Sequence, residues 1–75
     1  MADTMKPGLI EVIVNGERRS MPEGQTVEGL LRALDLEPSR VAVELDRAIL
    51  KRPLWPHTVL RDDSRLEIVQ FVGGG

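Results

Sequence analysis

The sequence predicts an α+β fold in which a mixed sheet of four to five strands carries one main helix on one face. Three observations predict it: alternating apolar residues before an Asn-Gly turn, one amphipathic helical stripe, and alternating apolar segments in the second half. The 75 residues have room for one small domain. We expect it over residues 9–72, after a flexible leader at 1–8 and before a flexible glycine tail at 73–75.

The first two strands are predicted by the apolar segment Leu9–Val14 and the dipeptide Asn15-Gly16 that follows it. Asn-Gly favours a type I′ hairpin turn, because both central residues of that turn need positive φ. Residues 17–21 are short and polar, which suits a strand at the edge of a sheet. Within the first strand, alternation directs Ile13 away from the face that holds the helix.

A single helix is predicted to begin after Thr26, whose hydroxyl suits an N-cap. Its apolar residues follow the spacing i, i+3, i+4, i+7 and form one stripe: Val27, Leu30, Leu31 and Leu34. Pro38 ends the helix at or before residue 37. A helix of this length is unstable alone in water, so it must cover a sheet.

The second half of the chain predicts the remaining strands at residues 40–45, 48–50 and 66–72, the last being the longest. Residues 51–56 contain two prolines, which exclude a central strand and predict an irregular loop or a 3₁₀ turn. Leu54 or Trp55 is expected to anchor this loop in the core.

The composition excludes several classes of function. The chain has no cysteine and a single histidine, His57, for which we find no catalytic partner, and we expect no metal site. A net charge of −2 with interspersed signs argues against nucleic acid or an anionic membrane as a partner. No apolar segment reaches transmembrane length and no signal peptide is present, so we expect a cytoplasmic protein.

The last three residues, Gly73, Gly74 and Gly75, place the α-carboxylate on a stalk of about 10 Å. Glycine has no Cβ and permits close approach of another backbone. One interpretation is a frayed terminus. The other is that the carboxylate is a reactive group, which enters the active site of another protein.

The upstream segments favour the second interpretation. Five of them resemble, in the same order, segments of one known protein family: residues 10–17, 24–31, 41–45, 52–55 and 62–69. Over residues 9–75 the chain resembles ubiquitin-like β-grasp domains and, among these, the ThiS sulfur carriers of thiamine biosynthesis. It departs from the usual family pattern at Asp46, where an Asn is common, and in its longer leader.

The resemblance implies a sheet with the last strand in the middle, beside the first strand and parallel to it. The expected core is then Ile10, Val12, Val14, Leu30, Leu31, Leu34, Val41, Val43, Leu66 and Ile68. Val69 and Phe71 should point to the opposite face. There they would join Ile13 in a patch that docks partner proteins.

The resemblance also implies the chemistry. A ThiF-like adenylyltransferase uses ATP to adenylate the carboxylate of Gly75, while Gly73 and Gly74 thread its channel. A cysteine desulfurase persulfide provides sulfur, and the resulting thiocarboxylate serves a ThiG-like thiazole synthase. The chain itself is then a protein co-substrate that binds no cofactor, rather than an enzyme.

Two alternatives stay open at this point. A MoaD-like carrier for molybdopterin would share the fold and chemistry and differ in the sulfur acceptor. A ubiquitin-like modifier or interaction module would use the same terminus differently. Three terminal glycines, the short length and the tryptophan loop favour the thiazole carrier.

Overall fold

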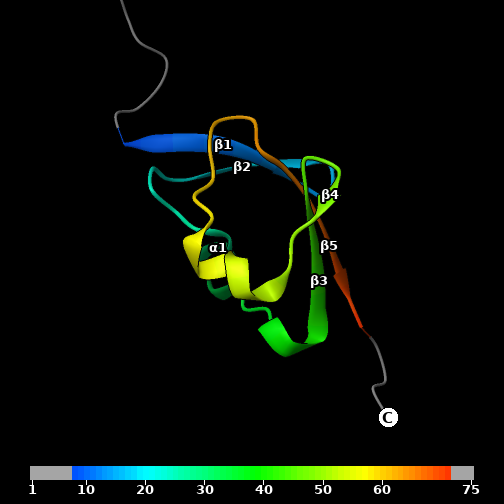
Figure 1. The fold of residues 1–75 in the computed structure, drawn as a ribbon. Coiled ribbons are helices and arrows are strands. Elements are labelled where there is room, and N and C mark those ends of the chain that lie inside the picture. Colours follow the sequence, from blue (N-terminus) through cyan, green and yellow to red (C-terminus); the bar gives the residue numbers. More distant parts are fainter. Residues whose placement is uncertain (1–7, 72–75) are drawn as a thin grey trace, which may run out of the picture.

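The computed structural model describes residues 8–71, and it confirms the predicted α+β class (Figure 1). Five strands form one mixed sheet in the order β2-β1-β5-β3-β4. The elements are β1 (Leu9–Val14), β2 (Glu17–Pro22), α1 (Val27–Ala33), the 3₁₀ helix η1 (Pro38–Arg40), β3 (Val41–Leu45), β4 (Ala48–Ile49), the 3₁₀ helix η2 (Arg52–His57) and β5 (Arg65–Gln70).

β5 lies in the middle of the sheet, as expected. It is parallel to β1, which it pairs at only two positions, Ile13 with Arg65 and Val14 with Leu66. It is antiparallel to β3, which it pairs from Leu66 to Gln70. The prediction that the last strand is the longest was wrong, because β5 has six residues, as do β1 and β2.

The predicted hairpin turn between β1 and β2 is confirmed. Asn15 has φ 50° and Gly16 has φ 85°, so both adopt the left-handed conformation that a type I′ turn requires. β2 forms the edge of the sheet, in agreement with its polar sequence.

The helix begins as predicted and ends at Ala33, within the limit that Pro38 sets. The Thr26 hydroxyl accepts a hydrogen bond from the N–H of Gly29 at 3.0 Å, which satisfies one free donor of the first turn. At the other end, Asp35 adopts φ 61° and donates to Arg32, while Leu36 donates to Leu31. These two bonds make a Schellman motif, so α1 stops at Ala33, well before Pro38.

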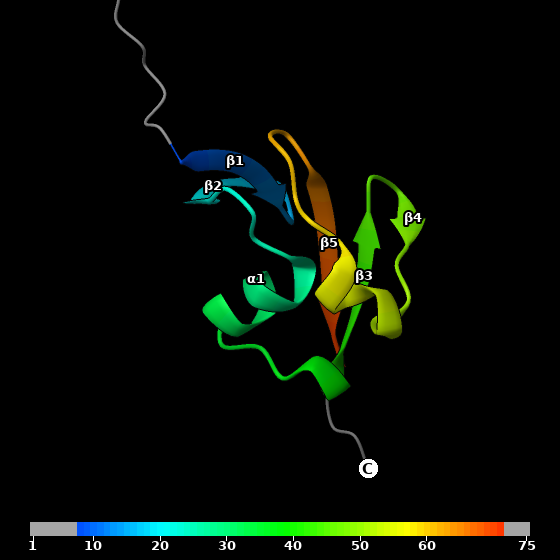
Figure 2. The same ribbon diagram turned by 60° about the vertical axis from the view of Figure 1, so that its left-hand side comes forward.

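A single core fills the space between the sheet and the helical side of the molecule, where α1 and η2 lie side by side (Figure 2). All ten expected core residues belong to it; nine are buried and Leu34 is partly buried. Trp55 anchors the proline-rich segment: it is 3% exposed and its Nε1–H donates to the Leu50 carbonyl at 2.9 Å. Leu54 is 50% exposed, so it is not the anchor.

Candidate functional site at the C-terminal end of the central strand

The base of the glycine tail is attached to the sheet through β5. Phe71, the last residue that the structure describes, donates its backbone N–H to the carbonyl of Arg40 at 2.7 Å. Gly73, Gly74 and Gly75, the predicted threading and reactive residues, lie outside the described residues. The structure therefore places the last hydrogen-bonded residue at the end of the central strand, Phe71, two residues before the glycines.

The other edge of β5 is held by a side chain. β1 ends at Val14, and beyond it the side-chain amide of Asn15 takes the place of a further strand residue. Its Oδ1 accepts from the N–H of Ile68 at 2.7 Å, and its Nδ2 donates to the carbonyl of the same residue at 3.2 Å. The strand that carries the tail is thus fixed on both sides up to Ile68.

The face of the sheet opposite α1 carries an exposed apolar surface, and two predicted docking residues lie on it. Val69 is 58% exposed and Phe71 is 53% exposed. Ala42 pairs directly with Val69 across the β3–β5 ladder, and Ile49 of β4 is 77% exposed on the same face. We call these four residues the outer-face patch: Ala42, Ile49, Val69 and Phe71.

The expectation that Ile13 is exposed in this patch was wrong, because its side chain is only 8% exposed. Ile13 lies on the correct face, but it is flanked by Arg18 in β2 and Arg65 in β5, its direct cross-strand neighbours. Long arginine side chains cover apolar surface with their stems while the guanidinium stays in water. Ile13 therefore offers almost no surface to a partner.

Two carboxylates border the outer-face patch. Glu44 of β3 and Glu67 of β5 are directly paired across the ladder and exposed on the patch side. Neither forms an ion pair with another of residues 8–71. Together with apolar residues they line a depression of about 140 Å³, whose walls are Ala42, Val43, Glu44, Ile49, Glu67 and Val69. The surface thus suits a partner with an apolar group flanked by basic side chains.

Ile49 and Ala42 were missed as docking residues by the sequence reasoning. Alternation placed the Ala42 side chain on the outer face, and a short strand was expected around Ile49. What was missing was the neighbour relationship: the order β5-β3-β4 brings Val69, Ala42 and Ile49 to one face across three adjacent strands.

Several of the other charged residues among residues 8–71 make structural contacts. Within the part of the chain that the structure describes, no three His, Asp or Glu side chains cluster as metal ligands, and no helix is long and apolar enough to cross a membrane. Arg18 forms an ion pair with Glu11 at 2.9 Å, and Arg52 stacks over Trp55 at 5.5 Å from the ring centre. Asp62 accepts from the N–H of Glu11 in β1 at 2.8 Å.

Comparison with known sequences finds one family model and several relatives. The family model described as "ThiS family" matches residues 12–75, which include the terminal glycines. The thiazole synthase of Magnetococcus marinus is 39% identical over 66 residues, which are 88% of this chain and 20% of that protein. The chain therefore spans about a fifth of the length of that relative. The sulfur carrier protein ThiS of Escherichia coli is 26% identical over 66 residues, which cover all of it.

Comparison with solved structures agrees. The crystal structure of the thiamine biosynthesis protein ThiS from Geobacter metallireducens superimposes with a TM-score of 0.76 at 32% sequence identity. The match covers 88% of this chain and 100% of the other. The expected ubiquitin-like β-grasp fold is thereby confirmed.

Proposed function

Because the chain belongs to the ThiS family, we propose that it is a sulfur carrier protein for the thiazole ring of thiamine. Its C-terminal carboxylate at Gly75 is adenylated and then converted to the thiocarboxylate that donates the sulfur. The observation that carries the proposal is the family match, which extends through all three terminal glycines. The strand that leads to them is the central one of the sheet.

The proposed chemistry follows from the weakness of a carboxylate as an electrophile. Transfer of AMP from ATP to the Gly75 carboxylate, with release of pyrophosphate, gives it a good leaving group. A persulfide sulfur then attacks the carbonyl carbon and displaces AMP, and reduction of the acyl disulfide by a thiol leaves the thiocarboxylate. We assign activation to a ThiF-like adenylyltransferase and sulfur supply to a cysteine desulfurase.

The chain acts as a protein co-substrate: it presents the Gly75 carboxylate to the partner enzymes and does not itself catalyse the reaction. The hydrogen bond between Phe71 and Arg40 fixes the point at which the tail leaves the domain. Gly73 and Gly74 carry no side chain that would clash in a narrow channel. The outer-face patch lies beside this exit, so a partner that docks on it is positioned to take up the tail.

Similarity to a segment of a thiazole synthase favours the thiazole ring, rather than molybdopterin, as the destination of the sulfur. In Magnetococcus marinus, a segment similar to this chain is part of a thiazole synthase. Joining a carrier to its acceptor enzyme raises their effective concentration, which supports a ThiG-like thiazole synthase as the partner. We place this exchange in the cytoplasm, where ATP and the partner enzymes meet.

Mass spectrometry of the intact protein tests the proposal. Incubation with the adenylyltransferase, ATP, a cysteine desulfurase, cysteine and a thiol reductant should add about 16 Da, the exchange of oxygen for sulfur. A reaction without ATP is the control and should leave the mass unchanged. An unchanged mass in the complete reaction overturns the proposal.

A further inference from the structure

The edge of β5 that faces β1 is open at Gln70. Hydrogen-bonding groups alternate between the two edges of a strand. In β5, Leu66 and Ile68 bond toward β1 and Asn15, whereas Phe71 bonds toward Arg40 beside β3. The backbone N–H and C=O of Gln70 therefore face the β1 side, past the point where β1 ends. No other group among residues 8–71 pairs with them there.

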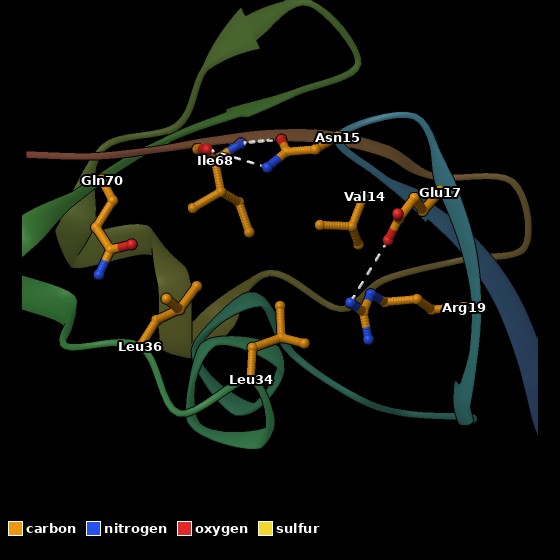
Figure 3. Close-up of a pocket in the computed structure, with 8 residues that line it drawn as sticks. All are labelled: Val14, Asn15, Glu17, Arg19, Leu34, Leu36, Ile68 and Gln70. Atoms are coloured by element: carbon orange, nitrogen blue, oxygen red, sulfur yellow. Dashed lines mark hydrogen bonds and ion pairs between the residues drawn. The ribbon is translucent and has the colours of Figure 1, made fainter.

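A groove lies beside this open edge, on the helical side of the sheet (Figure 3). Its volume is about 260 Å³, and its walls are Val14, Asn15, Glu17, Arg19, Leu34, Leu36, Ile68 and Gln70. Figure 3 shows Leu34 and Leu36 pointing across the groove toward Ile68 and Val14. We call this feature the edge groove. It is smaller than the roughly 300–1,000 Å³ of small-molecule sites, so an amino-acid side chain fits it better than a cofactor.

The charges of the edge groove differ from those of the outer-face patch. Arg19 and Glu17 lie 3.7 Å apart at one end of the groove and offset each other. The other walls are uncharged. The outer-face patch is instead bordered by the carboxylates Glu44 and Glu67, which form no ion pair with another of residues 8–71. The two surfaces, on opposite faces of β5, therefore suit partners of different character.

We propose that the edge groove binds an extended segment of the thiazole synthase. The segment adds a short strand beside β5, pairs its backbone with Gln70, and inserts one uncharged apolar side chain between Leu36 and Ile68. This is strand addition to an open sheet edge, in which backbone bonds provide affinity and the side-chain pocket provides specificity. The inference rests on the proposed function and adds to it a second docking surface.

Charge assigns the two partners to the two surfaces. Glu44 and Glu67 beside the outer-face patch suit a partner surface with basic side chains, and we assign this surface to the adenylyltransferase. The neutral, apolar edge groove is left for the sulfur acceptor. One backbone pair and one side chain make a weak contact. A weak contact suffices where carrier and synthase share one chain, as in Magnetococcus marinus, because the tether raises their effective concentration.

Amide hydrogen exchange tests the edge groove without any variant. The ¹⁵N-labelled chain is mixed with the organism's thiazole synthase, and exchange is measured by NMR. We expect the Gln70 amide to exchange at least about tenfold more slowly in the complex, because it gains an acceptor. The Val69 amide, which already lies in the ladder with β3, is the internal control. Unchanged exchange at Gln70 in a saturated complex overturns the proposal.

Two substitutions at one position separate the backbone from the side chain. Gln70→Pro removes the N–H that the segment should bind, whereas Gln70→Ala keeps it. Because this N–H is not used in the ladder with β3, both variants should keep the fold, which a ¹⁵N spectrum checks. We expect Gln70→Pro to weaken synthase binding roughly 3- to 10-fold and Gln70→Ala less than about twofold. Equal affinities for the two variants contradict strand addition.

Variants in the groove and on the opposite face identify the partner. Leu36→Asp should weaken synthase binding by about tenfold or more, because it places a charge in the apolar groove. Ile49→Asp, on the outer-face patch, should leave synthase binding unchanged. If Ile49→Asp weakens synthase binding and Leu36→Asp does not, the synthase does not bind in the edge groove. The same conclusion follows if Leu36→Asp weakens only adenylyltransferase binding. A missing gain of about 16 Da with Gln70 still protected overturns the sulfur-carrier function and leaves the groove standing.

Discussion

The side-chain amide of Asn15 forms two hydrogen bonds with the backbone of a single residue, Ile68, at 2.7 and 3.2 Å. Asn15 also adopts φ 50° in the hairpin turn. One residue thus makes the turn and fixes the strand that carries the tail. Glycine would satisfy the turn but not the strand, and this difference is measurable.

Asn15→Gly should lower the free energy of unfolding by about 1–2 kcal/mol, because the Ile68 N–H and C=O lose their partner while the turn stays unstrained. Chemical denaturation measures the loss, and amide exchange at Ile68 should accelerate. Asn15→Asp keeps the acceptor for the Ile68 N–H but loses the donor to the Ile68 carbonyl. Its stability should therefore lie between that of the unmodified chain and that of Asn15→Gly. Unchanged Ile68 exchange in Asn15→Gly would show that the amide does not hold the strand.

Deletion of Gly75 should abolish thiocarboxylate formation and leave stability within about 0.5 kcal/mol of the full chain. The new carboxylate, on Gly74, is about one residue too short to reach the position of the old one. Intact mass and thermal unfolding measure the two effects. Gly75→Ala, which keeps the length, is the matched variant and tests whether the channel excludes a methyl group. Sulfur transfer that persists in the deletion would place the reactive group elsewhere.

Phe71→Asp and Val69→Asp should each weaken adenylyltransferase binding by about tenfold or more, because a charge replaces an apolar contact in the outer-face patch. Isothermal titration calorimetry measures the affinity. Leu54→Asp is the control, since Leu54 is about as exposed, at 50%, but lies in η2 on the other side of the sheet. An equal loss in all three variants would argue against a specific patch.

Glu67→Gln should slow association with the adenylyltransferase and reduce its dependence on salt, because the outer-face patch loses one of the two carboxylates that border it. The same change should raise the midpoint of thermal unfolding slightly, since Glu67 directly faces Glu44 across the ladder. Stopped-flow kinetics at several salt concentrations provide the test. Glu23→Gln, at an exposed position beyond β2, is the control. Association that depends on salt equally in both variants would show that the acidic pair does not steer binding.

Trp55→Phe should lower the free energy of unfolding by about 1–3 kcal/mol without changing sulfur transfer. The variant keeps an aromatic ring in the core but leaves the Leu50 carbonyl without its indole donor. Urea unfolding and the intact-mass assay together separate structure from function. Lost sulfur transfer in a folded Trp55→Phe protein would contradict a purely structural role.

Local chemistry explains what was predictable from the sequence. The Asn-Gly turn, the Thr26 cap and the alternation of apolar residues depend on neighbours in the chain, and each is confirmed. The helix end was not predictable in the same way. Pro38 set only an outer limit, whereas the left-handed Asp35 and its Schellman motif end α1 earlier.

The sequence by itself determined the fold class, the faces of the strands and the position of the glycine tail, because these follow from residue type and period. Only the tertiary structure decided which residues of a face are exposed. Ile13, whose cross-strand neighbours are Arg18 and Arg65, is 8% exposed. Ile49 is 77% exposed and lies on the same face as Val69, with β3 between their strands. The tertiary structure also decided that Gln70 faces an open edge, since this depends on how far β5 extends past β1. Alternation specifies a direction for each side chain, but strand order and register specify its neighbours.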